Sequence, residues 1–166
     1  TLKDYRTAYT HYQMAVDLNP KAPYAKFCVK SAVFAAQEIA KKDSPTPNAL
    51  TEGEQLEISA ISRFLELWPE DKDTQKMRFL KAYLYYNKGL FKESIPPFLE
   101  AIQADPGSKE AQQAATLILD SLTLMQDWES LKETSQTLLH IKGLGNAVFH
   151  SQLKAIYRHA RKMAKA

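Results

Sequence analysis

The sequence contains a single cysteine, Cys28, so no internal disulfide framework can hold the chain together. Only five glycines and eight prolines occur among its 166 residues, too few for a disordered or loop-rich chain. No apolar run reaches the length of about 18 residues that a transmembrane helix needs, and no signal-peptide pattern stands at the start. The remaining composition, 45% apolar and 25% charged, is typical of a globular chain of one or at most two domains with a real core.

The sequence also lacks the usual signatures of catalysis or metal binding. Cys28 has no surrounding pattern of a nucleophile, and Glu52, Glu54 and Glu57 are interpreted as a polar helix face rather than an acid/base pair. The histidines occur singly, without i, i+4 pairing: His11, His140, His150 and His159. We therefore expect no enzyme activity, no metal site and no cofactor.

What the sequence does contain is clearest in residues 82–106, AYLYYNKGLFKESIPPFLEAIQADP. Apolar residues recur there at helical spacing on both sides of Gly89, which predicts two helices with Gly89 at the C-terminal end of the first. Pro96 and Pro97 fit only the first turn of a helix without kinking it, which places the second start near residues 92–94. The segment is interpreted as a helical hairpin.

The hairpin recurs along the chain. Tyr5 begins a series of like residues at the same offsets as the series that begins at Phe91 and ends at Pro106. The closing prolines Pro20, Pro69 and Pro106 stand 49 and 37 residues apart. Internal repetition at such periods is typical of helical repeat proteins.

These residues resemble the tetratricopeptide repeat (TPR) family, in which a pattern of small, aromatic, glycine and proline positions recurs about every 34 residues. The best copy consists of Arg78, Lys81, Ala82, Tyr85, Gly89, Phe91, Ser94, Phe98, Ala101 and Pro106. Lys30 and Lys81 depart from the family, which prefers Leu at both positions. Residues 41–50, rich in Pro, Ser and Asn, account for most of the excess length between the first two prolines.

The resemblance implies an all-α fold, an α-solenoid of antiparallel hairpins that forms a right-handed superhelix with a concave side. Residues 1–140 would be the repeat domain and residues 141–166 a basic capping helix of the same domain. Because the chain begins on the second helix of a repeat, we expect further repeats upstream. Eight helices are predicted, near residues 2–18, 22–41, 51–67, 72–87, 92–104, 108–125, 128–140 and 146–165.

In the TPR family, one face of each first helix lines the concave groove. Carried over, this implies as partner-binding residues Lys76, Phe79, Tyr83, Tyr86, Asn87, Lys109, Gln112, Thr116, Leu119 and Asp120. An earlier copy implies Ala25, Cys28, Ala32, Ala35 and Ala36. Phe79 and Tyr83 could instead pack under a neighbouring helix, and Tyr86 is expected to be the more exposed ring.

The resemblance implies a partner peptide or protein bound in the groove. It disfavours the C-terminal carboxylate of heat-shock chaperones, because no Lys/Asn pair stands four residues apart at the matching positions. The groove would serve a reversible scaffold, or permanent contacts within a larger machine or a homo-oligomer. The later repeats are similar to bacterial TPR proteins of the cell envelope, so we expect a periplasmic or envelope location slightly more than a cytoplasmic one.

A second candidate surface lies at the basic end of the chain. From Lys142 onward there are six Lys or Arg and no acidic residue, so with a net charge of +3 the part of the chain before Lys142 sums to −3. The predicted last helix carries an apolar stripe and, on other faces, Lys154, Arg158, Arg161, Lys162 and Lys165. It is interpreted as a cap with a solvated outer face, or as a site for an acidic protein, nucleic acid or a membrane surface. Aromatic residues do not interleave with the cations, which disfavours nucleic acid.

Overall fold

The computed structural model describes residues 2–166, and their side chains from Asp4 onward. Over this part of the chain the fold is all-α, with eight helices and no strand, as the sequence predicted. The helices are α1 (Leu2–Leu18), α2 (Ala25–Ala40), α3 (Glu52–Leu67), α4 (Thr74–Asn87), α5 (Phe91–Ala104), α6 (Lys109–Leu124), α7 (Trp128–Leu139) and α8 (Ala147–Lys165). Thr1, where the expected repeat domain begins, lies outside the described residues.

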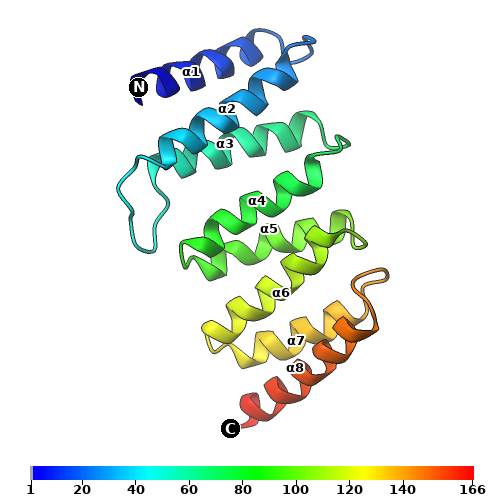
Figure 1. Cartoon of the computed structure of the whole chain (residues 1–166). Helices are drawn as coiled ribbons and strands as arrows, with labels where there is room; N and C mark the ends of the chain where they lie inside the picture. The colour runs from blue at the N-terminus through cyan, green and yellow to red at the C-terminus, as the bar shows by residue number, and fades with distance from the viewer. Residues whose placement is uncertain (1) are drawn as a thin grey trace.

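The helices follow one another in an elongated stack, with the two termini at opposite ends (Figure 1). Each helix packs against the helices that precede and follow it in the chain. Within residues 2–166, α4 and α6 are the single pair of helices that come into backbone proximity without being consecutive. No helix in this range combines the length and the apolar character needed to cross a bilayer.

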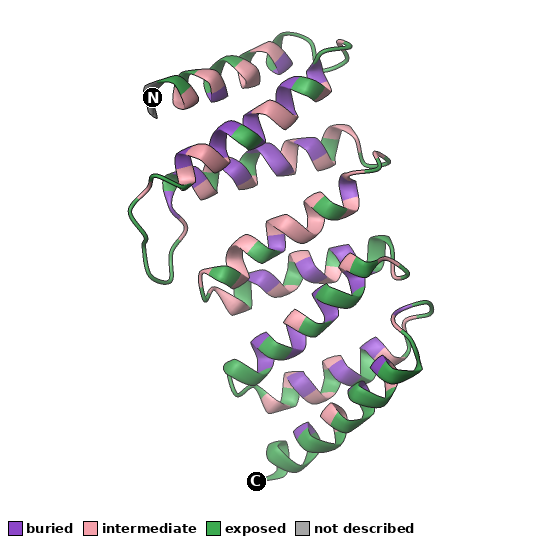
Figure 2. Ribbon diagram, in the orientation of Figure 1, coloured by how far each residue is buried: buried purple, intermediate pink, exposed green. Residues whose placement is uncertain are grey.

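The core is divided along this stack, and Figure 2 shows the buried residues on the inward sides of the helices. The largest cluster joins α4 to α8 and is centred on Phe98, Ile118, Leu138 and Leu153, all fully buried. Two smaller clusters join α1 to α4, one around Ile61 and one around Val16, Val29 and Phe64. Small residues such as Ala82, Ala101 and Ala114 are also fully buried, which lets neighbouring helices approach closely.

Gly89 ends α4 as the sequence predicted. Its φ of +72° is a left-handed conformation, which glycine adopts without a Cβ clash. The N–H of Gly89 donates to the carbonyl of Tyr86 at 2.9 Å, and the N–H of Leu90 donates to the carbonyl of Tyr85 at 3.0 Å. This pair of bonds is the Schellman motif, which satisfies two carbonyls at the helix end and turns the chain into α5.

The start of α5 differs from the prediction. The helix begins at Phe91, so Pro96 and Pro97 lie in its second turn instead of its first. Proline has no N–H, so the carbonyls of Lys92 and Glu93 lose their usual partners four residues on. The helix is nevertheless maintained because its apolar side is fixed in the core by Phe98, Ala101 and Ile102.

The α2–α3 connection is the long, irregular turn that residues 41–50 predicted, and α3 starts with a capping box. The hydroxyl of Thr51 accepts a hydrogen bond from the N–H of Glu54, whose carboxylate accepts one from the N–H of Thr51 at 2.8 Å. The other oxygen of Glu54 lies 3.1 Å from Nζ of Lys88, in the α4–α5 turn. Successive hairpins are thus joined by a half-buried ion pair.

Two more ion pairs tie α2 to the α3–α4 turn. Lys26 donates to Asp71 at 2.7 Å and Lys30 donates to Asp73 at 2.5 Å, and these hydrogen bonds lower the pKa of both carboxyl groups below the ordinary value. The Lys30 ammonium also lies 5.5 Å from the centroid of the Phe64 ring. Lys30, which departs from the TPR pattern, therefore has a structural role in this chain.

Candidate functional site

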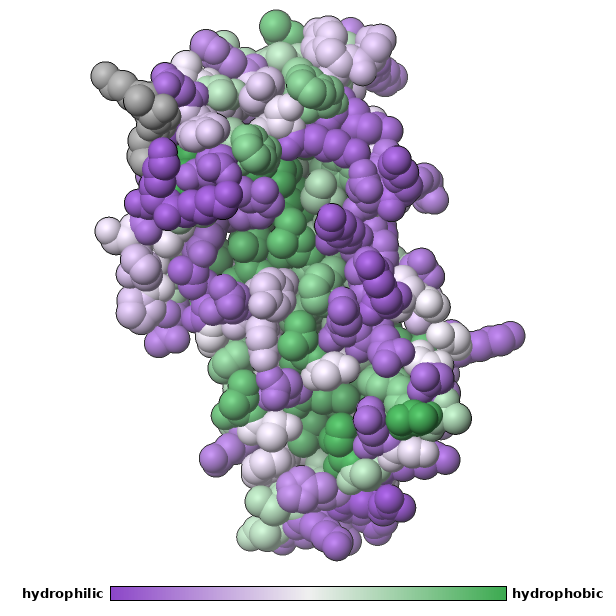
Figure 3. Space-filling model, in the orientation of Figure 1, coloured by the Kyte–Doolittle hydropathy of each residue, from purple (hydrophilic) through white to green (hydrophobic). Residues whose placement is uncertain are grey.

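The candidate site is a surface built by α4, α6 and α8, which lie on the near side of the stack in Figure 1. Figure 3 shows apolar side chains along the middle of this face, with hydrophilic side chains on both sides. Two depressions lie on it. One, of about 320 Å³, is lined by Phe79 of α4 and by Gln113, Thr116 and Leu117 of α6.

The second depression, of about 230 Å³, continues from α6 to α8. It is lined by Thr116, Leu119, Asp120, Thr123, Phe149, Gln152, Leu153 and Ile156. Thr116 lines both depressions, so they form one surface across three helices. We call it the α4–α6–α8 groove.

The aromatic wall of the groove comes from one side of α4. Phe79 and Tyr83 are stacked with ring centroids 5.9 Å apart, and Tyr83 and Tyr86 are stacked at 6.1 Å. Phe79 and Tyr86 also contact the buried ring of Phe98, so they are anchored in the core. Tyr83 is the exposed member of the three, with 40% of its surface accessible. The expectation that Tyr86 would be the more exposed ring is wrong.

Tyr86 is half-buried because it reaches from α4 to α6. Its hydroxyl donates a hydrogen bond to the carboxylate of Asp120. This hydrogen bond, burial and the negative charge of Asp120 raise the pKa of Tyr86 to about 12. The pair fixes the separation of the two helices in the middle of the groove.

The structure brings together six of the residues expected to bind a partner. Phe79, Thr116, Leu119 and Asp120 line the depressions. Tyr83 and Tyr86 line neither, but Tyr83 stacks on Phe79 and Tyr86 bonds to Asp120. The other four, Lys76, Asn87, Lys109 and Gln112, are exposed near the ends of α4 and α6 and line neither depression. The α8 wall was missed, because the stripe containing Phe149, Leu153 and Ile156 was interpreted only as packing. Its accessible edge, the exposed Gln152 and the half-buried Ile156, is revealed only by the placement of α8 beside α6.

On α2 the register carried over from the resemblance is wrong. Ala25, Cys28, Ala32, Ala35 and Ala36 are buried in the core instead of lining a groove. The exposed side of α2 carries Phe27 and Phe34, which are 67% and 56% exposed. Their rings meet Tyr12 and Tyr5 of α1 edge to face. These aromatic residues form a separate surface near the other end of the stack.

Glu57 does not belong to a polar helix face. It is 4% exposed, packed between α3 and α2, and accepts a hydrogen bond from Gln37 at 2.8 Å. Burial, with the nearby charge of Glu54, raises the pKa of Glu57 above its ordinary value, and the Gln37 hydrogen bond opposes this shift. It is a structural carboxyl group outside the groove.

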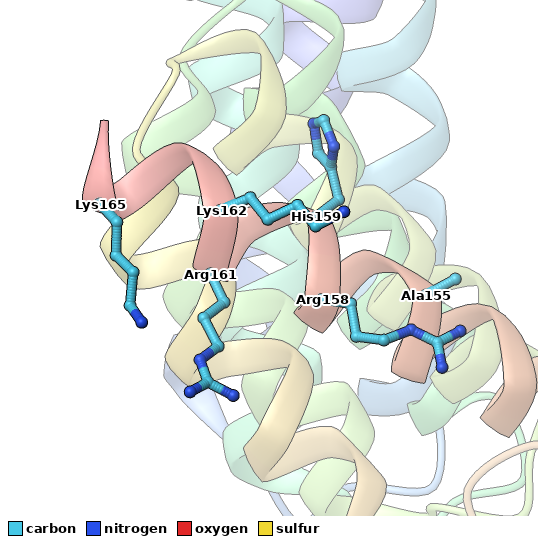
Figure 4. A pocket seen from close by; sticks show the side chains of 6 residues that line it. All are labelled: Ala155, Arg158, His159, Arg161, Lys162 and Lys165. Atoms are coloured by element: carbon cyan, nitrogen blue, oxygen red, sulfur yellow. The ribbon is translucent and has the colours of Figure 1, made fainter.

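All five predicted cations of α8 are exposed on this helix: Lys154, Arg158, Arg161, Lys162 and Lys165. We call them the α8 basic stripe. Four of them, with Ala155 and His159, line a shallow depression of about 490 Å³. Figure 4 shows that all six side chains come from α8. The ring of His159 meets Trp128 of α7 edge to face, at 5.8 Å between centroids.

A search of protein-family models finds no match for this chain, and a search of curated proteins finds none either. Among the described residues, no group of three or more His, Cys, Asp or Glu is arranged to hold a metal ion.

Proposed function

We propose that this chain is a non-catalytic protein–protein interaction scaffold that binds a peptide segment of a partner in the α4–α6–α8 groove. The observation that carries the proposal is the groove itself: an exposed aromatic ring, Tyr83, is stacked on Phe79, which lines one of two depressions that share Thr116. Aromatic side chains supply large contact area at low entropy cost, and such residues dominate binding energy at interfaces.

The proposed architecture is a TPR-like solenoid, in keeping with the sequence resemblance. It is supported by the hairpin at Gly89, by packing between consecutive helices, and by the contact between α4 and α6, the first helices of successive hairpins. In such stacks each unit contacts its neighbours and an extended surface is left for binding. A reversible scaffold is favoured over a permanent assembly component because the groove holds polar groups, Gln113, Thr116 and Gln152, that can hydrogen-bond a peptide backbone.

The proposal is tested by selecting binding peptides from a random library on the full chain and measuring their Kd values by fluorescence anisotropy. Tyr83→Ala should lower the affinity for the selected peptides about tenfold or more, because it removes the exposed anchor of the groove. Thr116→Arg should lower this affinity too, since the new side chain would fill the point where the two depressions meet. Both positions are solvent-exposed, so the fold should be retained.

Phe27→Ala is the matched control, because Phe27 is an exposed aromatic residue on α2, outside the groove. Its Kd values should stay within about twofold of the native protein. If peptides bind Tyr83→Ala and Thr116→Arg as tightly as the native chain, the groove is not the binding site. If Phe27→Ala is the variant that loses binding, the α2 surface takes its place.

A further inference from the structure

The α8 basic stripe places five exposed cations on one helix. At about 100° per residue, its five cations fall within an arc of roughly 100° on the helix. That arc lies opposite the buried residues Phe149, Leu153 and Ala160. The whole charged face of α8 is therefore directed away from the protein core.

The cations of the stripe have no acidic partner within the described chain. No Asp or Glu forms an ion pair with any of the five. Elsewhere cations do pair between elements, as Lys26 does with Asp71 and Arg63 with Asp17. The positive charge of the stripe is thus uncompensated over about three helical turns.

The cations form two parallel rows on the outer face of α8. Lys154, Arg158 and Lys162 are spaced four residues apart in one row, and Arg161 and Lys165 are spaced four apart in the other. The depression of about 490 Å³ is lined by cations of both rows, Arg158, Arg161, Lys162 and Lys165, and beside them by Ala155 and His159. Residues four apart rise about 6 Å along a helix, and rows of this kind pack against the equivalent rows of a second helix.

We propose that the α8 basic stripe binds an acidic helical segment of a partner protein, with its carboxylates spaced four residues apart. One row of carboxylates would lie between the two basic rows, so that each meets cations on both sides at the same repeat of about 6 Å. This surface is separate from the α4–α6–α8 groove and does not depend on it.

The charge of the rest of the chain favours a short acidic segment over a long polyanion. Residues 1–141 carry a net charge of −3, and α7, which packs on α8, carries Glu129 and Glu133 on its exposed side. Glu129 is paired with Lys132, whereas Glu133 forms no ion pair in the described chain. A nucleic acid or a lipid bilayer would extend past α8 toward this net negative part of the chain, whereas a short acidic helix could stay on α8.

The test uses the full chain and a labelled synthetic alanine-based helix with glutamates four residues apart, with binding followed by anisotropy. Two probe controls are the same peptide with Gln for Glu, and a peptide of equal charge with its glutamates on all sides. The protein variant replaces the four cations that line the depression: Arg158→Gln, Arg161→Gln, Lys162→Gln and Lys165→Gln. The matched variant makes the same charge change at exposed lysines elsewhere: Lys21→Gln, Lys72→Gln, Lys92→Gln and Lys142→Gln. Circular dichroism confirms that both variants are helical.

We expect the acidic helix to bind the native chain, and we expect this binding to weaken as salt is raised. Its affinity for the α8 variant should be about tenfold lower. The matched variant should lose no more than about twofold, and the Gln peptide should not bind. Equal losses in both variants, or equal binding of the peptide with dispersed glutamates, would overturn the proposal. So would tighter binding of single-stranded DNA, duplex DNA or phosphatidylserine vesicles than of the peptide, measured in the same buffer.

Discussion

The hydroxyl of Tyr86 donates a hydrogen bond to the carboxylate of Asp120, and this bond joins α4 to α6 across the groove. Among residues 2–166 these are the two non-consecutive helices whose backbones come close to each other. The sequence analysis singled out both residues, and it expected them to contact a partner. In the structure they bind each other, and thereby hold Phe79 and Tyr83 beside the α6 wall.

The Tyr86–Asp120 bond predicts a pH effect at the alkaline end. The pKa of Tyr86 is raised to about 12, above the value of about 10 in an unfolded chain, so the bond stabilises the fold below pH ~10 and this contribution is lost as pH rises through ~12. Asp120→Asn should lower the pKa of Tyr86, because the negative charge is gone. Ultraviolet absorbance of tyrosinate measures this, with Tyr86→Phe identifying the residue. If the most alkaline step of the tyrosinate titration is the same in both variants as in the native protein, Tyr86 does not interact with Asp120.

Gly53 predicts a sharp steric limit between α2 and α3. A Cβ at this position would lie 2.5 Å from the Cα of Ala40 and closer still to its backbone nitrogen. Backbone cannot move aside as a side chain can, so Gly53→Ala should lower the free energy of unfolding by about 3 kcal/mol. Gly107→Ala is the control, since its nearest new neighbour is 3.9 Å away, and it should change stability by less than about 0.5 kcal/mol. Urea denaturation compares the two, and similar midpoints would contradict the close approach.

The Lys88–Glu54 ion pair should stabilise the fold more than the ion pairs on the open surface do. Both side chains are only 15% exposed, and Glu54 also closes the capping box of α3. Lys88→Gln should therefore lower the free energy of unfolding by about 2 kcal/mol, because a half-buried carboxylate loses its counter-charge. Lys132→Gln, which breaks an exposed pair with Glu129 on α7, should leave the urea midpoint unchanged. A double-mutant cycle with Glu54→Gln that shows no coupling would exclude the pair as a joint between hairpins.

The contribution of Glu57 to stability should change with pH in the opposite direction to that of a paired surface carboxylate. Because burial raises its pKa in the folded state, the native protein binds this proton more tightly than the unfolded chain does. Its stability contribution is present below the ordinary pKa of a glutamate and is lost as pH rises through the raised value. Glu57→Gln should keep the Gln37 hydrogen bond and lack this loss, so its stability relative to the native protein should increase between acid and neutral pH. A constant difference in urea midpoint across that range would be evidence against a buried carboxylate.

The helices were predictable from the sequence because local signals set them. Gly89 marks a left-handed helix end, and apolar spacing marks each inward side, so the predicted ranges differ from the observed bounds by three residues or fewer. The start of α5 was misplaced because tertiary packing of Phe98 and Ile102 outweighs the cost of Pro96 and Pro97. Local rules carry no information on that balance.

The candidate site was less predictable, because it depends on which helices lie side by side. The α4 and α6 residues were found through the TPR resemblance, but Gln152 and Ile156 join them only once α8 is placed against α6. The burial of Glu57 depends on the approach of α2, and the partner of Tyr86 lies 34 residues away. Such pairings are set by packing between helices, which periodicity within one helix does not specify.

The contacts of this chain run almost entirely between consecutive helices, and this has a mechanical consequence. A force that pulls the two ends of the chain apart would separate the stack one hairpin at a time, because few contacts join distant parts of the chain. Because α8 is the last helix of the stack, extension from that end would remove the α8 wall of the groove first, while the Tyr86–Asp120 bond and the α4–α6 contact still hold the other two walls together.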